Sequence, residues 1–251
     1  DEDAARVLED VFERRGVRVM PRSRASAVER TEDGSGVIVT LSDGRKVSGT
    51  HCLVAIGSIP NTEDLGLEAA GVEHTPSGHI TVDGVSRTSV NNIYAAGDCT
   101  GVYPLASVAA MQGRIAMAHI LGDTVRPLRT DKVAANIFTS PEIATVGIGE
   151  KDLHEGAYRG EAVTLQLSTN PRAKMMAMRD GFVKVFARRH SGTVIGGVVV
   201  GQRASELIYP IALAVEKKLT VDDLAETFTV YPSLSGSIAE AARKLHTRSK
   251  F

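Results

Sequence analysis

The sequence predicts an α/β fold: the closing parts of doubly wound domains, followed by an α+β domain built on an antiparallel sheet. A continuous apolar run at residues 52–56 is typical of a strand buried on both faces, and a second strand at 93–96 leads into a helix. These two observations predict the doubly wound parts. The last domain is predicted because strands at 181–189 and 194–201 form a hairpin, which a helix at 204–218 follows.

The N-terminal elements are consistent with this class. A helix is predicted at residues 4–15, because apolar side chains recur on one face and Gly16 follows as a stop signal. Short strands are predicted at 17–20, 24–30 and 36–41. This order resembles the second half of a dinucleotide-binding domain, whose first half carries G-x-G-x-x-G. That motif occurs nowhere in the 251 residues, so we expect the chain to begin in the middle of such a domain.

The segment after the predicted strand at 93–96 indicates a ligand site. Gly97 lets the backbone approach a ligand closely, and the carboxylate of Asp98 can accept hydrogen bonds from sugar-like hydroxyls. The following helix starts at Leu105, Ala106 and Ser107, where unpaired N–H groups favour negative charge. A flavin has a chain of ribityl hydroxyls and a pyrimidine edge that becomes negative on reduction. Alone, however, a Gly-Asp pair after a strand is most often an ordinary turn.

Longer motifs carry a resemblance to a known family. Residues 88–98 run Thr-Ser-Val, a short gap and then Ile-Tyr-Ala-Ala-Gly-Asp, which resembles the second FAD-binding motif of the pyridine-nucleotide–disulfide oxidoreductases. Residues 55–61, Ala-Ile-Gly-Ser-Ile-Pro-Asn, resemble the stretch where that family's chain leaves its nicotinamide domain for its FAD domain. The resemblance implies FAD and NAD(P)H as cofactors and places Gly57 near them. It also implies that the helix start at 105–107 meets the flavin's pyrimidine edge through backbone groups.

The resemblance extends to the end of the chain. Residues 137–147 are similar to the start of the family's dimerisation domain, and residues 201–207 match its G-x-x-A-S-E-L pattern. It implies that residues 1–59 complete the NAD(P)-binding domain, 60–126 complete the FAD-binding domain, and 127–251 form the dimerisation domain. A homodimer is therefore expected, in which the terminal segment of each chain reaches the partner's flavin.

One segment departs from the family pattern. The family's dithiol enzymes carry His-Pro-Thr-Leu-Ser-Glu where this chain has Tyr231-Pro-Ser-Leu-Ser-Gly236. Thiol–disulfide exchange needs a proton acceptor near neutral pH. Histidine titrates near 6.5 and tyrosine near 10, so Tyr231 is a poor replacement. Gly236 has no side chain that could orient an acid–base group. We therefore expect electrons to pass from the flavin to a small acceptor such as a quinone, with Tyr231 either donating a hydrogen bond or filling the emptied site.

Composition limits the other functions. The net charge of −1 and the absence of Trp argue against nucleic-acid binding, and no apolar run reaches the length of a membrane helix. The histidines and the two cysteines show no metal-ligand spacing, so we expect no metal site, and the few cysteines fit a cytoplasmic location. Two alternatives to a quinone-reducing enzyme stay open: a dihydrolipoamide dehydrogenase or related dithiol oxidoreductase, and a non-enzymatic binding or assembly module.

Overall fold

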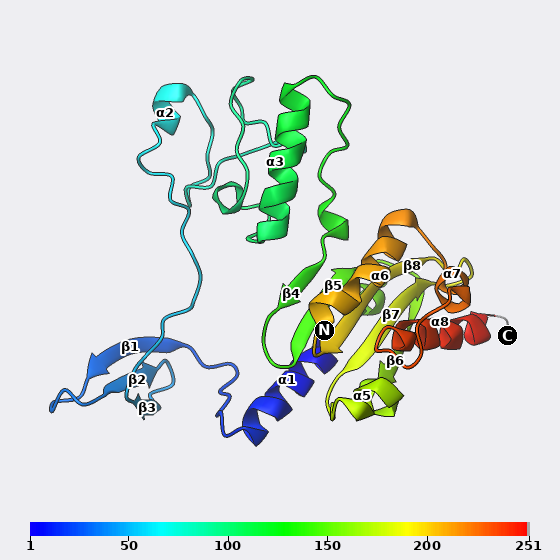
Figure 1. The fold of residues 1–251 in the computed structure, drawn as a ribbon. Helices are drawn as coiled ribbons and strands as arrows, with labels where there is room; N and C mark the ends of the chain where they lie inside the picture. The colour runs from blue at the N-terminus through cyan, green and yellow to red at the C-terminus, as the bar shows by residue number, and fades with distance from the viewer. Residues whose placement is uncertain (250–251) are drawn as a thin grey trace. The chain divides into compact units, whose positions relative to one another are not determined.

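The computed structural model describes residues 1–249, which form two compact units (Figure 1). One unit comprises Asp1–Val11 and the chain from Pro60 onward, and the other comprises Phe12–Ile59. The chain mixes helices with two antiparallel sheets, which confirms the predicted α/β class with an antiparallel α+β domain. Among the described residues, no helix combines the length and the apolar character needed to cross a membrane.

The smaller unit is built on a three-stranded antiparallel sheet. Its strands are β1 (Ala25–Arg30), β2 (Val37–Leu41) and β3 (Lys46–Gly49), in that spatial order. These strands agree with the predicted runs at 24–30 and 36–41. The predicted strand at 17–20 is wrong, because those residues are irregular in the structure.

Two predicted strands of the doubly wound parts do not form. Residues 52–56 are irregular, and their side chains are exposed rather than buried: 89% of Leu53 and 93% of Ile56 is accessible. Residues 93–96 contain only an isolated bridge between Arg87 and Tyr94. A buried strand needs neighbouring strands on both edges to accept and donate its backbone hydrogen bonds. No such neighbours occur among the described residues, so both segments remain without a sheet.

Residues 60–126 contain one long helix. It is α3 (Ala106–Ile120), preceded by the short helix α2 (Leu67–Ala70) and the 3₁₀ turn η1 (Asp98–Thr100). The helix begins where the sequence predicts it. The rest of this stretch is turns and loops, tied together by backbone hydrogen bonds such as Ile80 N to Cys99 O at 2.8 Å.

The C-terminal part contains a five-stranded antiparallel sheet in the order β4-β5-β8-β7-β6. The strands are β4 (Ala135–Ile137), β5 (Glu142–Gly147), β6 (Gly160–Gln166), β7 (Phe182–Arg188) and β8 (Val194–Gly201). The hairpin of β7 and β8 confirms the prediction for 181–189 and 194–201. Short elements connect the strands: η2 (Thr130–Lys132), α4 (Glu150–His154), η3 (Leu167–Thr169) and α5 (Pro171–Met175).

Helices cover both faces of this sheet (Figure 1). One face packs against α6 (Ala204–Lys217), α7 (Val221–Glu226) and α8 (Gly236–Ser249), and it forms the larger core. The other face packs against the first turns of α1 (Glu2–Arg14), whose Ala4 lies against Phe182 and Phe186. The side chains of β7 alternate between the two faces, as the period of a strand requires.

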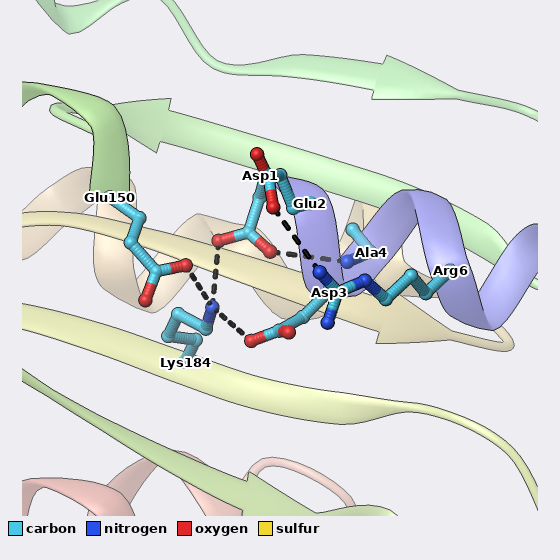
Figure 2. A network of polar contacts seen from close by, with 7 residues as sticks. All are labelled: Asp1, Glu2, Asp3, Ala4, Arg6, Glu150 and Lys184. Carbon is cyan, nitrogen blue, oxygen red and sulfur yellow. Dashed lines mark hydrogen bonds and ion pairs between the residues drawn. The ribbon is translucent and has the colours of Figure 1, made fainter.

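A buried lysine stands on the face that α1 covers (Figure 2). Lys184 lies between Phe182 and Phe186 on β7, and only 1% of its side chain is exposed. Its ammonium donates to the carboxylates of Asp1 at 2.9 Å, Asp3 at 2.7 Å and Glu150 at 2.9 Å. The hydrogen bond from Lys184 holds the pKa of Asp3 below its ordinary value. This lysine–carboxylate network joins α1, α4 and β7.

Candidate functional site

The predicted ligand site centres on the turn that begins at Gly97. This residue is buried and has φ 93° and ψ −161°, a conformation that a residue with a side chain rarely adopts. A Cβ atom on Gly97 would lie 3.4 Å from the Cβ of Ala109, so the backbone passes close to α3. The turn ends at Gly101 with φ 65°. The chain from Gly97 to Gly101 is thus a tight glycine-bounded turn against the helix.

Asp98 and the start of α3 are both open to a ligand. The carboxylate of Asp98 is exposed and accepts no hydrogen bond from any residue in the range 1–249. The helix begins after Leu105 without a side-chain cap, and Ala106 and Ser107 are exposed at its first turn. The first N–H groups of a helix carry partial positive charge and seek an acceptor. The site therefore offers one carboxylate acceptor and one set of backbone donors.

A buried glutamine, which the sequence reasoning missed, joins these two parts. Gln112 is 1% exposed, and its Oε1 accepts the N–H of Gly97 at 2.8 Å. Its Nε2 donates to Thr100 Oγ1 at 3.2 Å, and that hydroxyl donates to the carbonyl of Gly97 at 2.8 Å.

Near the other end of α3, the hydroxyl of Tyr94 lies 2.8 Å from Nδ1 of His119.

The sequence carries a signal for this glutamine. Val108, Gln112 and Ala116 are the buried residues of α3 and recur every four positions. A polar side chain in the middle of an otherwise apolar row must find partners in the interior.

Tyr231, the residue predicted to meet the electron acceptor, lies in a different segment from the Gly97 turn. Tyr231 belongs to residues 228–236, which we call the terminal loop, and 81% of it is exposed. Within the described part of the chain, no hydrogen bond or ring contact joins Tyr231 to the Gly97 turn. The loop also exposes two further apolar side chains, Phe228 at 102% and Val230 at 78%, and such exposed apolar groups often mark an interaction surface. Its role as an acceptor site stays a prediction.

Asn170 anchors the terminal loop. Its amide Nδ2 donates to the carbonyl of Ser233 at 2.9 Å and to Ser237 Oγ at 2.8 Å. Its Oδ1 caps α5 by accepting from Arg172 N at 2.8 Å. A cavity of about 550 Å³ lies between Asn170 and the loop, and Tyr231 lines it. One side chain therefore fixes both the start of α5 and the loop that carries Tyr231.

Gly57 lies in the smaller compact unit, Phe12–Ile59. It is exposed and has φ 139°, which again favours glycine. Its place near a cofactor stays a prediction.

One acidic cluster could hold a cation. The carboxylates of Asp1, Asp3 and Glu150 lie close enough to share one ion. The ammonium of Lys184 already lies within 2.9 Å of all three, so a side chain occupies the position that a cation would take. Its chemistry is that of an ion-pair network.

Comparisons with known proteins match both parts of the chain. Residues 1–113 match the family model described as pyridine nucleotide-disulphide oxidoreductase, and residues 133–242 match the dimerisation domain of the same group. A protein of Mycobacterium tuberculosis named NAD(P)H dehydrogenase (quinone) is 58% identical over 98% of this chain and 49% of its own length. A dihydrolipoyl dehydrogenase of Haloferax volcanii is 36% identical over 96% of this chain and 51% of its own.

A solved structure shows the same fold. The crystal structure of LpdA from Mycobacterium tuberculosis has a TM-score of 0.92 and 58% identity, and covers 98% of this chain and 53% of that one. The chain spans about half the length of the relatives that it matches. These matches confirm the resemblance seen in the motifs and the predicted cofactors, because members of that family depend on FAD and use NAD(P)H.

Proposed function

Because this chain belongs to the pyridine nucleotide-disulphide oxidoreductase family, we propose that it is part of a flavin-dependent NAD(P)H oxidoreductase. In this proposal the whole enzyme reduces a small acceptor such as a quinone. In this proposal residues 1–59 complete the NAD(P)-binding domain and residues 60–126 complete the FAD-binding domain. Residues 127–251 form the dimerisation domain; the last two lie outside the described residues.

The Gly97 turn is the observation that carries the proposal. Bound FAD supplies the redox chemistry, accepting hydride from NAD(P)H and passing electrons on. The chain supplies binding and orientation: the unpartnered carboxylate of Asp98 is suited to hydroxyl groups, and the uncapped start of α3 is suited to an edge that gains negative charge. Gly97 lets the turn pack closely against α3, because it has no side chain that would push the turn and the helix apart.

The terminal loop favours a small acceptor over a thiol. Tyr231 and Gly236 provide neither the imidazole nor the carboxylate that thiol exchange needs near neutral pH. The phenol of Tyr231 can donate a hydrogen bond to a quinone oxygen, and the exposed Phe228 offers an aromatic surface. The relative named NAD(P)H dehydrogenase (quinone) supports this acceptor class.

A homodimer belongs to the proposal. The match to a dimerisation domain supports it, and so does the exposed apolar row at Phe228, Val230 and Tyr231, which a partner subunit would cover. In such a dimer the terminal loop of one subunit serves the flavin of the other. A cytoplasmic location stays a prediction.

Dithiol chemistry is the second candidate, because one relative is named dihydrolipoyl dehydrogenase. The two candidates separate in one assay on the full-length protein: anaerobic oxidation of NADH and NADPH with a benzoquinone, compared with NAD(P)⁺ reduction by dihydrolipoamide. The proposal expects turnover with the quinone and little or none with the dithiol. Rapid turnover of dihydrolipoamide, without quinone reduction, would reverse the assignment. The family match favours either of these enzymes over a non-enzymatic module.

A further inference from the structure

Gln112 forms a closed ring of hydrogen bonds with the turn that carries Asp98. The ring runs from Gly97 N–H to Gln112 Oε1, from Gln112 Nε2 to Thr100 Oγ1, and from that hydroxyl back to the Gly97 carbonyl. Three side-chain bonds of 2.8, 3.2 and 2.8 Å thus fix both backbone polar groups of Gly97. Asp98 is the next residue, so the ring sets the direction in which the chain presents it.

The burial of this ring makes the arrangement strict. Gln112 is 1% exposed, Thr100 8%, and Gly97 is buried too. A buried amide without partners is strongly unfavourable, and here each of its two ends has one. Because these groups are buried, a different orientation of the turn would leave donors and acceptors in the interior unpaired. The ring therefore favours one conformation of the turn over its alternatives.

The same glutamine belongs to the helix whose first turn forms the other half of the site. Gln112 lies six residues beyond Ala106, which is about 9 Å along the axis of α3. Its position on a rigid helix means that the Asp98 carboxylate and the N-terminal amides of α3 are held by one element. A ligand that binds both the carboxylate and these amides would therefore find the two groups already held in position relative to each other.

We propose that Gln112 is a positioning residue for the flavin: it holds the Gly97–Thr100 turn so that Asp98 and the start of α3 bind one FAD together. This inference rests on the proposed function, since it assumes that FAD is the ligand. It goes beyond that function by assigning the preorganisation of the site to a side chain that does not face the ligand.

The test compares Gln112→Met with the wild-type full-length protein. Methionine keeps the length and helix preference of glutamine but removes both hydrogen bonds. The flavin is removed, and FAD affinity is measured by titration, together with the visible circular dichroism of the rebound flavin. We expect Gln112→Met to weaken FAD binding by about tenfold or more and to alter the flavin's dichroism. Gln166→Met, at an exposed glutamine of β6, is the matched control and should bind FAD as wild type does.

Thr100→Val is the second variant, because it breaks the ring with a side chain of nearly the same shape. It should weaken FAD binding in the same direction and decides the matter if Gln112→Met fails to fold. Unchanged FAD affinity and unchanged flavin dichroism in the folded variants, with only a lower melting temperature, would overturn the proposal and leave a purely structural glutamine. A wild-type protein that binds no FAD would instead refute the proposed function, so the two failures are distinguishable.

Discussion

Removal of the Lys184 ammonium should strongly destabilise the unit that contains the five-stranded sheet. Lys184→Met keeps an unbranched side chain of similar length but leaves three carboxylates without their shared partner. The side chain of Asp1 is only 2% exposed, so its charge would stay buried and unpaired. Breaking a buried pair in this way costs about 3–5 kcal/mol. Asp3 and Glu150 are 47% and 34% exposed, so water can solvate them and each adds only about 0–1 kcal/mol.

The assay is denaturant unfolding of the purified protein at pH 7, with the change in midpoint converted through the slope of the transition. Lys151→Met is the matched control, because Lys151 forms an exposed pair with Glu155 at 3.7 Å, and its loss should cost about 0–1 kcal/mol. The double variant Lys184→Met with Asp1→Asn should recover part of the loss, since it removes the buried charge. A cost for Lys184→Met as small as that of Lys151→Met would show that the network does not hold α1 on the sheet.

Two further predictions concern pH and the terminal loop. Because the pKa of Asp3 is lowered from its ordinary value of 3.8 by the hydrogen bond from Lys184, this carboxylate stabilises the fold above pH 3.8, and the contribution is lost as the pH falls below it. Unfolding midpoints measured from pH 7 to pH 3 should therefore fall more steeply in wild type than in Lys184→Met; parallel curves would contradict the assignment. Asn170→Ala should lower the free energy of unfolding by about 1–3 kcal/mol, because it removes a helix cap and the bonds to Ser233 and Ser237. It should also speed proteolytic cleavage in the terminal loop, and an unchanged cleavage rate would show that the loop is held by other contacts.

The sequence predicted best those elements whose partners lie within the chain. Strands β7 and β8 pair with each other, and α6 packs on them, so hydrophobic period and turn residues were sufficient. Residues 52–56 have the same apolar character, but a strand forms only where neighbours supply backbone hydrogen bonds. The local pattern states what a segment can bury, and the presence of a partner decides whether it does.

Only those parts of the candidate site that are close together in the sequence could be predicted. Gly97, Asp98 and the start of α3 follow each other in sequence, so a motif can reveal them. Gln112 and Asn170 act through contacts across 15 and 63 residues, which no local pattern displays. The role of Lys184 could not be predicted, because a lysine in an apolar strand only breaks the hydrophobic pattern. Its role becomes clear from the three carboxylates that contact it in the structure.

The central claim is that Asp98 and the N-terminus of α3 bind FAD, and FAD titration of the flavin-free full-length protein tests it most directly. Wild type should bind FAD and turn yellow, while Asp98→Ala should lose at least about tenfold in affinity, because it removes a charged hydrogen-bond acceptor. Asp123→Ala, at an exposed acid just beyond α3, should bind FAD as wild type does. A wild-type protein that stays colourless in excess FAD, or an Asp98→Ala variant that binds as tightly as wild type, would contradict the claim.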